Sequence, residues 1–185
     1  MRDDKQDNEC GQSIVELAVT LPLLLFMFLG TVELGQVCYA AINVSNAAKA
    51  AAQYGAQDTN TAVQTGNMLT AAQQEIGTAV PGQTSPLDMP AATTMPDGSP
   101  LPSGTVCTPS GGSYTCSYCS CSSPDSGQAP FACGSTTALT QCTGISHLEQ
   151  NIIIQTHIFV KPIVALPGLP SPYSLFGHAV VKRLQ

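Results

Sequence analysis

The chain has 185 residues, enough for one modest domain, and only 10% of them are charged, against about a quarter in typical soluble domains. The formal net charge is −6, and the six basic residues are scattered along the chain. No basic stripe is present to neutralise phosphates, so we set nucleic-acid binding aside. The abundance of small and uncharged polar residues suits an exported or filament surface better than a cytosolic enzyme.

The first predicted element is a transmembrane helix. Residues 14–32 read IVELAVTLPLLLFMFLGTV, which is about the ~20 residues that a helix needs to cross the hydrocarbon core of a bilayer. Arg2 and Lys5 precede this run, whereas the next base, Lys49, lies seventeen positions after its end. The bias in basic residues places the N-terminus in the cytoplasm and everything after about residue 33 outside it.

A secretory signal peptide cut after Ala40 is the alternative interpretation of this run. Ala40 and Cys38, two positions earlier, are small enough for such a cleavage site. The apolar stretch is long for a signal peptide, however, with Glu16 inside it and Glu33 just before the cleavage site. These features favour a retained membrane helix.

A short polar leader ends at Gly11, and Glu16 follows five residues later. The string GQSIVE resembles the type IV prepilin processing site, at which a membrane aspartyl peptidase cuts after the glycine. The resemblance implies a leader of residues 1–11 and a mature N-terminus at Gln12. The new ammonium of Gln12 could pair with the Glu16 carboxylate of a neighbouring subunit. Otherwise Glu16 simply reaches the membrane interface.

The membrane helix is expected to continue without a break as one rod over residues 12–57, about 65–70 Å long. Pro22 is a candidate kink within the bilayer. Small residues form a stripe on the rod at spacings of three and four, made of Val37, Ala41, Val44, Ala48, Ala51 and Gly55. This stripe fits close packing against other subunits or against the protein's own C-terminal part, and both possibilities remain open.

This N-terminal region is similar to that of the TadE-like family of minor pseudopilins from tight-adherence (Flp) pilus systems. The matching features are G-x-S-x-V-E-x-A from Gly11, the Leu-Pro-Leu-Leu-Leu run, the step Glu33-Leu34-Gly35 and the Ala-rich continuation to Gly55. The C-terminal strings IIIQTHIFVKP and HAVVKRLQ also resemble that family. The resemblance covers roughly residues 11–80 and 150–185.

The resemblance implies a minor pseudopilin that takes part in Tad/Flp pilus assembly, adhesion or secretion. The implied partners are a prepilin peptidase, other pilin or pseudopilin subunits and the inner-membrane Tad machinery. The implied location is the inner (cytoplasmic) membrane, with the option of incorporation into a pilus. The alternative function is a membrane-anchored, disulfide-rich extracytoplasmic binding or adhesion module that is not built into a pilus.

A second, amphipathic helix is predicted over residues 61–80, within a segment 58–81, with Asn60 as a candidate N-cap. Its apolar face consists of Leu69, Ala72, Ile76 and Val80. Pro81 and Gly82 end it. Residues 83–109 are rich in Pro, Thr and Ser, which predicts an irregular or mobile linker rather than a packed element.

The segment 82–148 contains a cysteine-rich loop, with six of the eight cysteines of the chain. They are Cys107, Cys116, Cys119, Cys121, Cys133 and Cys142. In an oxidising compartment such a loop is expected to be closed by disulfides, for which fifteen pairings are possible. The CxxC spacing at Cys116 also fits zinc, but the loop has no second CxxC and no histidine within the cluster.

The C-terminal segment 149–185 is predicted to be a β element. Over residues 151–161 four apolar residues point one way, Ile152, Ile154, Ile158 and Val160. Gln155, His157 and Lys161 point the other way, with Ile153 and Phe159. Residues 174–184 are expected to return as an antiparallel partner, or else to form a helix. Short strands near residues 106 and 114–116 are expected to join them.

The predicted fold class is therefore α+β: a long N-terminal membrane-spanning helix, a second amphipathic helix, and a small antiparallel β element with a disulfide-rich loop. His147, His157 and His178 lie in no catalytic motif, and we expect each of them to be a solvated strand or loop residue. The sequence predicts no catalytic residue, no cofactor and no metal site, and hence a protein that is not an enzyme.

Overall fold

The computed structural model describes residues 6–58, 61–77, 80–122, 129–133, 142, 147–164 and 171–184. Its helices are α1 (Gln6–Ala56), the short 3₁₀ helix η1 (Thr61–Val63) and α2 (Thr65–Ile76). Its strands are β1 (Val106–Ser110), β2 (Ser113–Cys121), β3 (Leu148–Val160) and β4 (Tyr173–Leu184). The predicted α+β class is confirmed.

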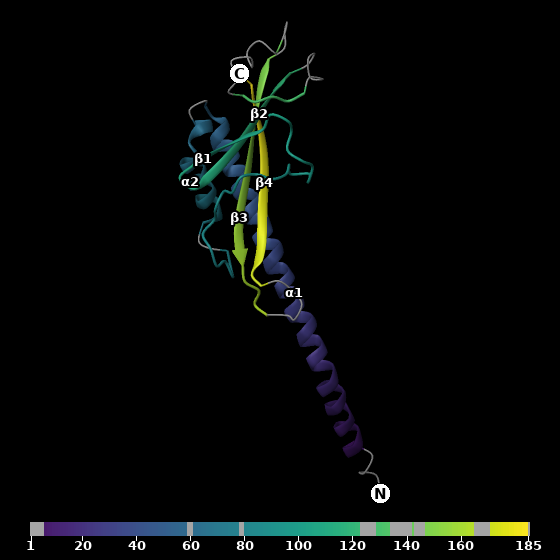
Figure 1. Ribbon diagram of the computed structural model, residues 1–185. Helices are drawn as coiled ribbons and strands as arrows, with labels where there is room; N and C mark the ends of the chain where they lie inside the picture. Colours follow the sequence, from purple (N-terminus) through teal and green to yellow (C-terminus); the bar gives the residue numbers. More distant parts are fainter. Residues whose placement is uncertain are drawn as a thin grey trace.

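The molecule consists of a rod and a head. α1 has 51 residues, which corresponds to about 76 Å of helix, and it continues through Pro22. Its N-terminal half protrudes alone, whereas its C-terminal half lies along the sheet and beside α2 (Figure 1). The head is therefore built on the second half of the helix that precedes it.

The sheet has four antiparallel strands in the order β1-β2-β3-β4. β3 and β4 pair along their whole length, from Glu149 with Leu184 to Val160 with Tyr173. The predicted strand at residues 151–161 and its antiparallel return are confirmed, and the helical alternative for residues 174–184 is wrong. The two short strands expected near residues 106 and 114–116 are β1 and β2.

One face of the sheet packs on α1. Ile152, Ile154, Ile158 and Val160 of β3 are fully buried in one cluster with six small residues of the helix, Ala40, Val44, Ala47, Ala48, Ala51 and Ala52. The contact is closest where the Thr156 hydroxyl donates a hydrogen bond of 2.9 Å to the carbonyl oxygen of Val44. The small-residue stripe of α1 thus lets helix and sheet approach closely, and from Val44 onward the protein's own head occupies it.

The Pro-rich segment of residues 83–105 first runs along the edge of β3 and then packs on the face of the sheet opposite α1. This segment is irregular, as predicted, but it is packed: Leu87, Met89 and Ala92 are buried. Its backbone pairs with β3 at Asp88 and His157, and the Thr93 N–H donates to the Gln155 side chain at 3.1 Å. The expectation of a linker that is not packed is wrong, because Leu87 and Met89 join the core with α1 and α2 and Ala92 packs beside Ile153 on the outer face of β3.

α2 ends four residues before the predicted boundary. Gly77 has a φ of 65° and a ψ of −139°, a conformation outside the helical region that glycine adopts without a Cβ clash, so the helix ends there. Met68 and Ala72 of α2 are fully buried, and Leu69 and Ile76 are half-buried against the same core. Val80 is buried beyond the helix, and Asn60, the predicted N-cap, lies outside the described residues.

Candidate functional site

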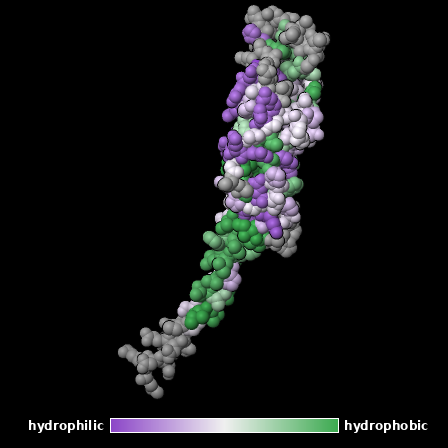
Figure 2. Space-filling view, turned by 90° about the vertical axis from the view of Figure 1, so that its left-hand side faces the viewer, coloured by the Kyte–Doolittle hydropathy of each residue, from purple (hydrophilic) through white to green (hydrophobic). Residues whose placement is uncertain are grey.

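The protruding half of α1 carries a continuous apolar surface, which we call the anchor surface and define as residues 11–32. Every residue in it is exposed, although most of the side chains are large and hydrophobic. Figure 2 shows hydrophobic side chains along this part of the rod and mainly hydrophilic ones on the head. Its 22 residues span about 33 Å, close to the ~30 Å of bilayer hydrocarbon. The anchor surface therefore fits a membrane anchor.

The predicted processing residues lie at the start of the anchor surface. Gly11, Gln12 and Glu16 all belong to α1 and are exposed. A Cβ added at Gly11 would meet nothing within 4 Å. The three residues are thus free of tertiary packing, and α1 places them on consecutive turns of one helix.

Ala40, after which a signal peptidase would cut, has a different environment. It lies inside the same continuous helix and is fully buried against the head. Residues on both sides of it, from Glu33 to Ala52, contribute to the interface with the sheet and the loops.

Glu33 marks the boundary between the anchor surface and the head. Its side chain is only 8% exposed, and its Oε2 accepts a hydrogen bond of 2.9 Å from the Ile163 N–H, just after β3. One turn further on, the Gln36 side chain donates a hydrogen bond of 2.7 Å to the carbonyl oxygen of Pro81. Glu33 and Gln36 together connect α1 to two loops of the head. Nothing in the sequence around Glu33 indicates this contact, because its partner lies 130 positions away.

The cysteine-rich region forms three disulfides: Cys107–Cys116, Cys119–Cys133 and Cys121–Cys142. The first joins directly paired residues of β1 and β2, and the other two start from β2. This region lies at the end of the sheet that is far from the anchor surface (Figure 1). Cys38 on α1 is a free, exposed thiol. Within the described ranges no group of three or more potential metal ligands is found.

His157 is an unpredicted polar site on the outer face of β3. Its Nδ1 lies 3.0 Å from Asp88 Oδ1 and its Nε2 lies 2.9 Å from Ser174 Oγ. The ring is 8% exposed and stacks on Phe176 at 4.5 Å between centroids. The expectation of a solvated His157 is wrong, because Asp88, Ser174 and the Phe176 ring enclose its side chain. His147 is exposed, as expected.

Asp88, His157 and Ser174 are connected in the same way as the aspartate, histidine and serine of Ser-His-Asp hydrolases, with the imidazole between the carboxylate and the hydroxyl. Catalysis of that kind needs, in addition, a substrate cleft and an oxyanion hole beside the serine. The cavities that we describe are lined by other residues. A buried imidazole needs a partner for each nitrogen, and these two contacts supply them. We therefore interpret His157 as a structural residue.

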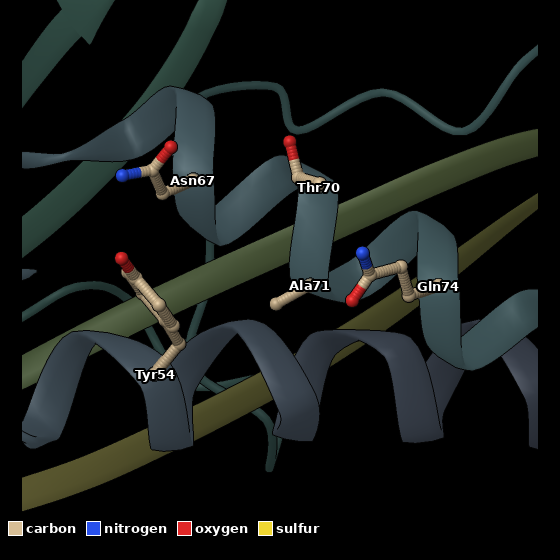
Figure 3. Close-up of a pocket in the computed structure, with 5 residues that line it drawn as sticks. All are labelled: Tyr54, Asn67, Thr70, Ala71 and Gln74. Carbon is tan, nitrogen blue, oxygen red and sulfur yellow. The ribbon is translucent and has the colours of Figure 1, made fainter.

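A shallow polar groove of about 320 Å³ lies between the two helices. Tyr54 of α1 and Asn67, Thr70, Ala71 and Gln74 of α2 line it (Figure 3). Several of these groups are already engaged: the Tyr54 hydroxyl and the Asn67 amide both donate to Gln64 Oε1, at 3.3 and 2.6 Å. The groove presents hydroxyls and amides without a charge, so it indicates no particular chemistry.

These features describe an α+β protein whose head is built on the same helix that carries the anchor surface, and that surface fits a membrane anchor. A model of the TadE-like protein family matches residues 11–53, from the glycine of the processing motif through the buried half of α1. Over this segment, which is 43 of the 185 residues, the chain is similar to TadE-like proteins. No curated protein and no solved structure matches the chain. The C-terminal resemblance, at residues 150–185, lies outside the match and stays a prediction.

Proposed function

We propose that this protein is a minor pseudopilin that helps to assemble or stabilise a Tad-type pilus after a prepilin peptidase has cut it behind Gly11. In this role it resides in the inner membrane with its N-terminus in the cytoplasm, and it acts through packing rather than through catalysis. Its partners are the peptidase, other pilin or pseudopilin subunits and the inner-membrane Tad machinery.

One observation carries the proposal: the processing motif and the family match both begin at Gly11, and the apolar run follows directly at Ile14. Removal of residues 1–11 would delete two bases and four acids and leave a mature chain that opens directly on its membrane span. Such an end is typical of a subunit that must leave the bilayer lengthwise and pack by its helix.

The local structure around Gly11 is compatible with cleavage. A peptidase needs an extended backbone, so the first turns of α1 must open. Glycine in a helix costs about 1 kcal/mol relative to alanine, and no tertiary contact holds Gly11 in place. The opening therefore has only local helix propensity to overcome.

Mass spectrometry of the membrane protein from cells that contain the cognate peptidase tests this proposal. We expect a mature chain that begins at Gln12, and an uncut chain for the Gly11→Val variant. Gly35→Val is the matched control, because Gly35 lies in the same helix and a Cβ there also meets nothing within 4 Å. A wild-type chain that retains Met1 in such cells contradicts the proposal.

The alternative, an adhesion or recognition head, is favoured by the position of the disulfides at the end of the molecule farthest from the anchor surface. Deleting the whole cysteine-rich region would remove β1 and β2, and with them half of the sheet. A sharper variant replaces Cys119, Cys121, Cys133 and Cys142 by serine, which releases the loop connections and keeps the Cys107–Cys116 pair. Normal piliation with lost attachment favours recognition by the loop, whereas unchanged attachment contradicts it. Cys38→Ser is the control.

A further inference from the structure

A small cavity lies where α1 leaves the anchor surface and meets the head. Phe26, Leu29, Gly30 and Glu33 line it from one face of α1, and Val164 closes it from the loop after β3. Its volume is about 90 Å³, more than the ~30 Å³ that one water occupies in the liquid. We call it the Glu33 pocket.

The Glu33 pocket contains a buried carboxylate oxygen without a partner. Glu33 Oε2 accepts the Ile163 N–H, but Oε1 is buried and has no hydrogen-bond partner among the described residues. A buried acceptor left unsatisfied costs about 1–3 kcal/mol, and more when it is charged. Neither the ion pair of His157 with Asp88 nor that of Lys182 with Glu149 involves Glu33. Any N–H or O–H donor would satisfy this oxygen, and a donor that carries positive charge would bind the carboxylate most strongly.

The walls of the pocket define the rest of the ligand. Phe26, Leu29 and Val164 are apolar, and Gly30 leaves the space open because it has no side chain. A matching ligand is a cationic group with N–H donors attached to a chain that tolerates apolar surroundings. Lipid headgroups with a primary ammonium and the side chain of a lysine both have this chemistry.

The depth of the pocket decides between these two sources. The anchor surface begins at Gly11, and Glu33 follows 22 residues later, which is about 33 Å along the helix. This distance places Glu33 at the headgroup level once residues 11–32 fill the hydrocarbon core. Phe26, Leu29 and Gly30 belong to the anchor surface itself, so lipids already surround three of the five lining residues.

We propose that the Glu33 pocket binds a phospholipid through its primary ammonium headgroup, with Glu33 Oε1 as the acceptor. The bound lipid stabilises the contact of α1 with the loop after β3 and fixes the depth of the head above the membrane. This inference requires that α1 spans a bilayer, but it depends neither on cleavage nor on a pilus.

The test uses the full chain in nanodiscs of phosphatidylcholine alone or of an equal mixture with phosphatidylethanolamine. The choline headgroup has the same charge as ethanolamine but no N–H donor, so the comparison isolates the hydrogen bond. A roughly tenfold preference for the ammonium headgroup corresponds to a rise in Tm of about 2–4 °C in the mixed discs, because only half of their lipid carries that headgroup.

Two variants should abolish this rise. In Glu33→Gln the amide oxygen is needed by the Ile163 N–H, so the NH₂ group faces the pocket and repels the ammonium. Gly30→Leu fills the pocket and leaves Glu33 intact. Glu16→Gln, the same chemical change on an exposed residue of the same helix, should keep the full rise and thereby controls for bulk effects of the lipid.

The proposal is overturned if the wild type has the same Tm in both discs, or if Glu33→Gln and Gly30→Leu keep the full rise. An equal Tm combined with photo-crosslinks from position 29 to another membrane protein in cells assigns the pocket to a protein cation and likewise overturns lipid binding. Because the difference between two discs is measured for each variant, a general loss of stability in a variant does not obscure the result.

Discussion

Gly177 is the point of closest approach between β4 and α1, and its replacement by alanine tests how the head is held on the anchor helix. A Cβ at this position would lie 2.6 Å from the carbonyl carbon of Val44 and 2.7 Å from the Thr156 hydroxyl oxygen, and closer still to the Val44 carbonyl oxygen. The Val44 atoms are backbone atoms within a helix and cannot rotate away. Gly177 has no positive φ, so the effect is steric.

The expected loss is about 2–3 kcal/mol. Overpacking of a closed core costs about 1–3 kcal/mol, and displacement of α1 also strains the hydrogen bond from Thr156 to Val44, worth about 1 kcal/mol. The lower chain entropy of unfolded alanine offsets about 0.5 kcal/mol. For a chain of this size the Tm should fall by about 4–12 °C.

Differential scanning calorimetry of the full chain in detergent micelles measures this effect. Gly66→Ala is the matched control, because Gly66 is an exposed residue of α2 where a Cβ meets nothing within 4 Å. Alanine there should raise stability by up to about 1 kcal/mol, through helix propensity alone. The packing argument is refuted if Gly177→Ala melts at or above the wild-type Tm.

Three further predictions concern the head. Met68→Ala should lower the free energy of unfolding by about 2–5 kcal/mol, because Met68 is fully buried. Leu69→Ala, at a half-buried position on the same helix, should lower it less, and thermal unfolding of both variants measures the difference. Removal of the disulfide between Cys119 and Cys133, which are 14 positions apart, should cost about 3 kcal/mol, and an unchanged Tm would contradict this pairing. Burial lowers the pKa of His178. Below about pH 6.5 the folded state therefore binds fewer protons than the unfolded state, and the free energy of unfolding decreases as the pH is lowered. His178→Gln should flatten this decline between pH 7.5 and 5.5, and an equal slope in wild type and variant would count against it.

The long elements could be predicted from the sequence because their signals are local and repeated. The apolar run at residues 14–32 and the alternation at residues 151–161 each extend over several turns or pairs, so a single exception does not disturb them. The short strands β1 and β2 could be placed because a two-stranded ribbon of β3 and β4 is too small to be stable alone. The TadE-like match lies within the same strongly patterned region.

The remaining features depend on contacts between residues far apart in the chain. Six cysteines in a Ser-rich and Gly-rich loop give no local reason to prefer one pairing, and only the register of β1 with β2 brings Cys107 opposite Cys116. The segment 83–105 has a composition typical of a linker, yet three buried side chains suffice to pack it on the sheet. His157 alternates correctly as a strand residue, but nothing local indicates that Asp88 and Ser174 will meet it.

The division of α1 at Glu33 limits how this protein can contact other subunits. The stripe of small residues from Val44 to Gly55 is the part of the helix best suited to close helix packing, and the sheet and α2 already cover it. In the proposed pseudopilin role, helix contacts with neighbouring subunits therefore come from the anchor surface, where Gly11 and Gly30 leave open space along the rod. Because Glu33 and Gln36 connect the head to the helix at this boundary, movement of the rod along its axis would carry the head with it.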